Sequence, residues 1–213
     1  MSTLYRQIAA LHRDGRPFAL ATVVRTQGST PQVVGAKLVV TADDPRGRAA
    51  GTLGGGCVEA DAILAARETL SQGGRSLRAY ELTEDLAWNT GLVCGGTMWI
   101  LAERGEDALN GSGRSMIDAL ADAAGGGPPI AIVTHLARSG RSSSFVSRAF
   151  VSADGGLAGS LGDASLDAMA ASAAVTQMRH GTPRLVSLDE EHDLLIEPVT
   201  GRPGLAIAGG GHV

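Results

Sequence analysis

Three glycines run directly into a cysteine in the stretch G-T-L-G-G-G-C-V-E-A. Consecutive glycines, here Gly54, Gly55 and Gly56, can turn successive N–H groups into one concavity, and the start of a helix adds a partial positive charge. Such a site favours anions such as phosphate, and it favours the reactive thiolate form of Cys57. Glu59 would oppose that effect if its carboxylate faced the thiol. The alternative is a small, packed cysteine at the beginning of a helix.

A second glycine–cysteine run, C-G-G, contains Cys94, Gly95 and Gly96. Its likeness to the first run predicts two glycine loops that face one pocket. The alternative is an ordinary cysteine that opens a buried strand.

A third candidate loop, Q-G-S-T-P, offers backbone and hydroxyl donors from Gly28, Ser29 and Thr30, and Pro31 stiffens it. A polar hairpin connection explains this loop equally well. Two cysteines are too few for a disulfide framework, and the scattered histidines (His12, His135, His180 and His192) show no ligand spacing. We therefore predict no metal site and interpret these histidines as structural or surface residues.

The elements that must position these loops follow from hydrophobic spacing. Leu4, Ile8 and Leu11 share one helical face near the N-terminus, and a second helix is predicted from Cys57 onward. Short apolar runs at residues 18–26, 36–42, 76–82 and 97–103 are typical of strands.

This order of elements repeats. Gly54 and Gly162, Cys57 and Ser165, and Glu59 and Asp167 are each 108 positions apart. We predict a mixed α/β fold (α+β being the alternative) made of two related strand–loop–strand–helix–strand halves that pack together. The predicted boundaries are 1–104 for the glycine–cysteine half, 105–129 for a helix and Gly/Pro linker, 130–200 for the second half, and 201–213 for a terminal stub. Sheet direction stays open.

The repeat makes the cysteine informative. The second half has G-D-A-S where the first has G-G-G-C, although the flanking G-S-L-G and the predicted helix remain. The scaffold therefore does not need Gly55, Gly56 or Cys57 in order to form, which favours a functional role for them.

Composition excludes several classes of function. The net charge of −4 offers no field for nucleic acid or an anionic membrane, and no apolar run is long enough to span a bilayer. With no signal-peptide pattern at the N-terminus, we expect a cytoplasmic protein.

Four segments together carry a family resemblance: A-T-V-V-R-T-Q-G-S-T-P-Q-V-V-G-A-K-L-V-V, G-T-L-G-G-G-C-V-E-A-D-A, G-L-V-C-G-G-T-M-W-I-L-A-E and I-E-P-V-T-G-R-P-G-L-A-I-A-G-G-G-H-V. Their order and spacing resemble the XdhC/CoxI family of maturation factors for xanthine and carbon monoxide dehydrogenases. The resemblance implies an accessory protein that holds the molybdenum cofactor, a pterin dithiolene bearing phosphate, as bound cargo. It also implies sulfuration with a cysteine desulfurase partner and handover to a molybdenum hydroxylase client.

Two features depart from the family pattern. Gln32 follows Pro31 where such proteins commonly have arginine, and G-L-A-I-A-G-G-G-H-V resembles only the first strand and glycine turn of a Rossmann domain. We therefore expect no NAD binding by this chain.

Three hypotheses follow from these residues. The favoured one is a molybdopterin chaperone, more a binding protein than an enzyme, whose candidate ligand residues are those of the three loops and Glu59. The second is a sulfurtransferase that uses Cys57 as a persulfide carrier. The third is a structural or interaction module with packed cysteines. A homodimer is compatible with each.

Overall fold

The structure is a computed structural model, and it describes residues 2–44, 49–82, 95–109, 114–140 and 142–201. Its first half contains a five-stranded sheet in the order β3-β2-β1-β5-β4. The elements of this half are α1 (Ser2–Arg13), β1 (Phe18–Gln27), β2 (Lys37–Thr41), β3 (Ala50–Gly51), α2 (Gly56–Gln72), β4 (Arg75–Glu81) and β5 (Thr97–Arg104).

The second half repeats this arrangement with the sheet order β8-β7-β6-β10-β9. Its elements are β6 (Ile130–Ser139), β7 (Ser142–Ser152), β8 (Leu157–Ser160), α6 (Ala164–His180), β9 (Arg184–Ser187) and β10 (His192–Val199), and α4 (Gly105–Leu109) and α5 (Arg114–Gly125) connect the halves. Every strand pairing in the described ranges is antiparallel. The predicted mixed α/β fold of two related halves is confirmed.

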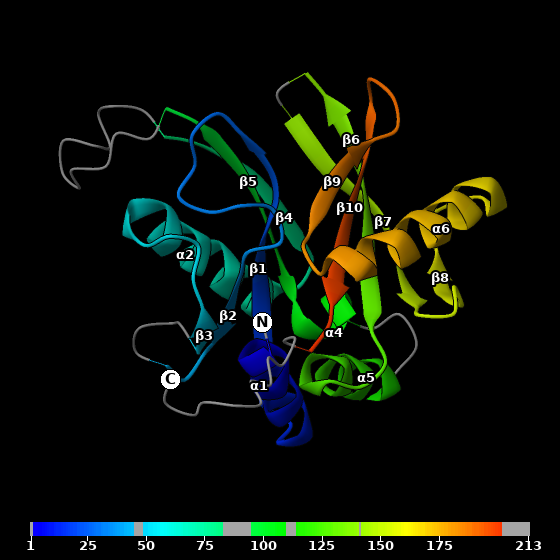
Figure 1. Cartoon of the computed structure of the whole chain (residues 1–213). Helices are drawn as coiled ribbons and strands as arrows, with labels where there is room; N and C mark the ends of the chain where they lie inside the picture. Colours follow the sequence, from blue (N-terminus) through cyan, green and yellow to red (C-terminus); the bar gives the residue numbers. More distant parts are fainter. Residues whose placement is uncertain (1, 45–48, 83–94, 110–113, 141, 202–213) are drawn as a thin grey trace, which may run out of the picture.

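The two sheets pack face to face and each carries one helix on its outer face (Figure 1). Alanines such as Ala62 and Ala66 bring α2 close to its sheet, and Ala170 and Ala174 do the same for α6; all four are fully buried. Val24, Leu101, Leu136 and Leu195 meet between the sheets. These apolar layers supply the main driving force for folding.

Helices α1 and α5 close one end of the molecule (Figure 1). Ile8 and Leu11 of α1 are buried, as the spacing of the sequence predicts, and they join Leu120 of α5 and Phe18 of β1 in one cluster. In the part of the chain that is described, no helix has the length and apolar character needed to cross a bilayer.

Two buried ion pairs join the halves reciprocally. Lys37 on β2 contacts Glu197 on β10 at 2.5 Å, and Arg148 on β7 contacts Glu103 on β5 at 2.7 Å. In each half the cation also donates to a threonine on the neighbouring strand, Thr22 at 3.2 Å or Thr134 at 3.1 Å. In each ion pair the cation comes from one half and the carboxylate from the other.

Candidate functional site

The loop before α2 has a backbone that only glycine adopts readily. The φ angles of Gly54, Gly55 and Gly56 are 104°, 78° and 70°. In the second half Asp163 stands in place of Gly55 and has an ordinary extended φ of −144°. Gly162, the counterpart of Gly54, keeps a positive φ of 131°. The helix can therefore begin with an ordinary backbone at the position of Gly55 but shares the positive φ at the position of Gly54.

Glu59 stabilises this loop through hydrogen bonds with the loop residues. Its Oε2 atom accepts hydrogen bonds from the Leu53 and Gly55 amides at 2.7 and 3.2 Å, and from the Thr52 hydroxyl at 2.6 Å. Asp167 does the same in the second half, accepting from the Leu161 amide at 2.6 Å. Glu59 is 7% exposed, and its carboxylate is engaged by the loop amides. Two of the amide donors of this loop are therefore taken by Glu59 and are not available to an anion.

The N-termini of α2 and α6 differ in one respect. Asp163 caps α6, with its Oδ1 atom accepting from the amides of Ser165 and Leu166 at 2.9 Å each. The N-cap of α2 is Gly55, which provides no side-chain hydrogen bond. A carboxylate oxygen therefore caps the helix in the second half, whereas the N-cap residue of the first half supplies no side-chain acceptor.

The thiol lies at the same helix end. Cys57 is in the first turn of α2, and its side chain is exposed and free. This cysteine is not packed in the core, unlike Val58 beside it, which is 8% exposed. Cys94 lies outside the described residues.

The three predicted loops are brought together. A Cβ atom on Gly28 would lie 3.1 Å from the Gly96 Cα, and one on Gly96 would lie 2.4 Å from the Ser29 carbonyl oxygen. A Cβ atom on Gly54 would lie 2.8 Å from the Pro31 Cβ. Glycine is required at these contacts because a larger residue would push the loops apart. The loop from Gly28 to Pro31 therefore bridges the other two.

The individual side chains of the bridging loop differ in what they offer. Ser29 is exposed, and Gly95 is exposed on the neighbouring loop. The Thr30 hydroxyl donates to the carbonyl oxygen of Gln32 at 2.8 Å, so it stabilises its own loop. Ser29 is therefore the more exposed of the two hydroxyl residues of this loop.

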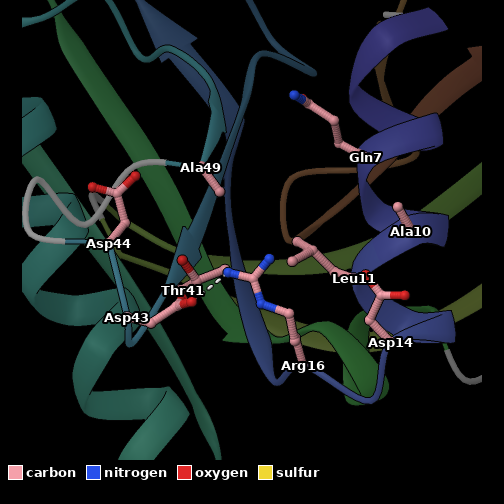
Figure 2. Close-up of a pocket in the computed structure, with 9 residues that line it drawn as sticks. All are labelled: Gln7, Ala10, Leu11, Asp14, Arg16, Thr41, Asp43, Asp44 and Ala49. Carbon is pink, nitrogen blue, oxygen red and sulfur yellow. Dashed lines mark hydrogen bonds and ion pairs between the residues drawn. The ribbon is translucent and has the colours of Figure 1, made fainter.

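Besides a hollow of about 410 Å³ at His12 and Arg16, two larger hollows lie near α1. One, of about 440 Å³, borders the glycine loop through Gln32 and Thr52 and reaches Pro183 of the second half. The other, of about 570 Å³, contains Arg16, which extends toward Asp43 and forms an ion pair with it, while Leu11 of α1 lines the opposite side (Figure 2). Among the described residues, neither of these two hollows is lined by Cys57 or by any other predicted site residue.

One polar contact, between His135 and His192, is not predicted from the sequence. His135 and His192 meet through Nε2 and Nδ1 at 3.0 Å, although 57 positions separate them. No local spacing signals this contact, because it depends on the pairing of β6 with β10.

Residues 11–81 match the model of the XdhC and CoxI family. A probable subunit of xanthine dehydrogenase from Bacillus subtilis is 32% identical over 106 residues, which are 49% of this chain and 31% of the relative. An uncharacterized protein, YqeB, from Escherichia coli is 34% identical over 95 residues, or 45% of this chain and 17% of that protein. The matched segments thus span less than a third of these relatives. The family resemblance seen in the sequence is confirmed by these matches.

A solved structure shares the fold. A xanthine dehydrogenase from Bacillus halodurans superposes with a TM-score of 0.54 at 24% identity, over 73% of this chain and 44% of that one. The arrangement of sheets and helices is therefore common to both proteins.

Proposed function

We propose that this chain is an accessory protein that binds the molybdenum cofactor, holds it during sulfuration, and passes it to a molybdenum hydroxylase such as xanthine or carbon monoxide dehydrogenase. It acts by binding and handover, in the cytoplasm, and carries out no turnover of its own. A cysteine desulfurase is the proposed sulfur donor. The family match and the names of the relatives support this role.

The observation that carries the proposal is the contrast between Gly55 and Asp163. At α6 the Asp163 carboxylate satisfies two amides of the first turn. At α2 the equivalent amides belong to Cys57 and Val58, and Gly55 has no side chain to reach them. A phosphate oxygen of the pterin cofactor suits this position, because a helix N-terminus provides both donors and a favourable dipole.

The remaining residues complete the proposed site. The exposed Cys57 thiol is suited to contact the sulfur-rich or metal end of the cofactor. Cys94, which lies outside the described residues, stays a proposed cofactor ligand from the sequence. Gly28, Ser29, Gly95 and Gly96 allow close backbone approach where the loops meet. We assign Glu59, Gly54 and Thr30 the part of positioning the loops rather than touching the cargo.

Pterin retention tests the proposal. Protein purified from cells that make the cofactor should release a pterin that fluoresces after oxidation. Cys57→Asp adds a negative charge at the α2 N-terminus, and we expect it to retain at least about tenfold less pterin than Cys57→Ser, which removes only the thiol. Ser165→Asp is the matched control at α6 and should retain as much as the unmodified chain. Absence of pterin from the unmodified protein would overturn the proposal.

A second candidate function rests on the exposure of Cys57. In a sulfurtransferase, the Cys57 thiolate would attack the outer sulfur of a donor persulfide; the donor S–S bond breaks, a new one forms on Cys57, and the donor leaves as a thiolate. Cys57→Ser should then abolish labelling by sulfur from a desulfurase while pterin retention persists. Equal labelling of the variant would exclude this role. The exposed thiol also weakens the hypothesis of a module with packed cysteines.

A further inference from the structure

A pair of histidines lies on the outer face of the second sheet, in contact with the loop before α6. His135 on β6 is paired with Leu194 on β10, two positions from His192, so both histidines face the same side. Their rings lie 5.0 Å apart between centroids at an angle of 48°. His135 is 7% exposed, and His192 is partly exposed, so the pair is open to solvent from one side.

The surroundings of His135 set its tautomer. Its Nδ1 atom lies 3.3 Å from the Leu161 carbonyl oxygen, which also accepts from the Ser147 hydroxyl at 2.9 Å. A carbonyl oxygen can only accept, so it favours a proton on Nδ1 and leaves a lone pair on Nε2. Metal-binding histidines are held in the same way, with one ring N–H donating to a carbonyl group.

The fold does not require these polar groups. Thr22 and Thr134 bind equivalent cations, so Val23 corresponds to His135. Met98 precedes Glu103 by five positions, as His192 precedes Glu197, so these two also correspond. Val23 and Met98 are fully buried and apolar. Two histidines in place of a packed apolar pair therefore need a separate explanation.

We propose that His135 and His192 bind one divalent transition-metal ion through Nε2 and Nδ1. Two nitrogens on a tetrahedral zinc ion lie roughly 3.3 Å apart, close to the observed 3.0 Å. On binding, the proton between the rings moves to Nε2 of His192, so both histidines stay neutral and each offers a lone pair to the ion. In the ranges described, no third histidine, cysteine or carboxylate completes a cluster, so water supplies the other ligands. Affinity is accordingly modest, and imidazole donors suit Zn²⁺, Ni²⁺ and Cu²⁺.

Calorimetric titration with Zn²⁺ and Ni²⁺ tests this site, using the whole chain with both cysteines replaced by serine so that thiols do not compete. One ion should bind per chain. His192→Gln and His135→Gln should each weaken binding at least about tenfold, whereas His180→Gln, at the exposed end of α6, should leave it unchanged.

Two results would overturn the site: no binding at millimolar metal, or equal affinity in the His192→Gln chain. His192 is partly exposed at the beginning of β10, so this variant keeps the test valid even if His135→Gln fails to fold. Since the experiment uses neither pterin nor Cys57, its outcome is separate from that of the pterin experiment.

Discussion

The Glu59 carboxylate is the centre of the hydrogen-bond network that shapes the cysteine loop. One oxygen accepts from two backbone amides and one hydroxyl, and the side chain is buried. Hydrogen bonds to a charged group are stronger than neutral ones, so this single residue fixes the backbone that presents Cys57. The Glu59 carboxylate is thereby stabilised by donors of its own loop.

Replacing Glu59 should loosen that loop. In Glu59→Ala the Leu53 and Gly55 amides lose their acceptor, and we expect the free energy of unfolding to fall by about 2 kcal/mol. Glu59→Gln, which keeps an acceptor oxygen, should lose less. Urea denaturation of both variants measures the difference. If Glu59→Ala were as stable as the unmodified chain, the carboxylate would not hold the loop.

At the scale of elements, α2 and α6 are two versions of one helix. Both have 17 residues, and both pack alanines against a sheet. In both, a carboxylate in the first turn accepts a hydrogen bond from a backbone amide of the preceding loop. They differ in their N-caps, because α6 satisfies its own first turn through Asp163 whereas α2 does not. The N-terminus of α6 thus has a side-chain cap, whereas the N-terminus of α2 has none.

This difference predicts an asymmetry in stability. Asp163→Ala should lower the free energy of unfolding by about 1 kcal/mol, because two amides lose their cap. Asp163→Gly, which imitates Gly55, should cost less than the alanine variant, since water reaches the exposed amides more easily. Thermal or urea denaturation provides the comparison. An Asp163→Ala chain of unchanged stability would show that the cap contributes nothing.

Most elements could be predicted from the sequence because their signals are local. The apolar face of α2 and the β-branched run of β1 follow from spacing alone, and the 108-residue offset matches α2 to α6. The hydrogen bonds of Glu59 could not be predicted in this way, because an acidic residue in a first turn fits equally well with capping, solvent or a ligand.

At the scale of the whole molecule, the buried ion pairs decide how the halves fit. Lys37 is 9% exposed at its side chain and Glu197 is 5% exposed, so neither charge has much water around it. Glu103 is 1% exposed and receives Arg148 together with Arg75. Charges buried to this degree must be paired, so the register of one half against the other is specified by chemistry as well as by shape.

Breaking one pair should be costly. Glu197→Gln leaves the Lys37 ammonium without its carboxylate, and we expect a loss of about 3–5 kcal/mol in unfolding free energy. The double variant Lys37→Met with Glu197→Leu should recover most of that loss, since it removes both charges. A double-mutant cycle by chemical denaturation measures the coupling. A fully stable Glu197→Gln chain would contradict this account of the interface.

Long-range pairing could not be predicted from local sequence signals. Strand direction, the approach of the two sheets and the meeting of His135 with His192 all depend on segments far apart in the chain. The sequence predicts that the two glycine–cysteine runs lie near each other only because the runs are alike. The structure shows that the loop from Gly28 to Pro31 contacts both Gly96 and Gly54 and so lies between them.

The ion pairs between the halves have a consequence for symmetry. Each half contributes one cation and one glutamate to the interface. The cation pairs with the glutamate of the other half, and the glutamate pairs with the other half's cation. Two identical copies of one half could satisfy the same pattern, with Lys37 of one copy facing Glu103 of the other. The reciprocal ion pairs therefore have the pattern that a two-fold symmetric pair of such halves would have.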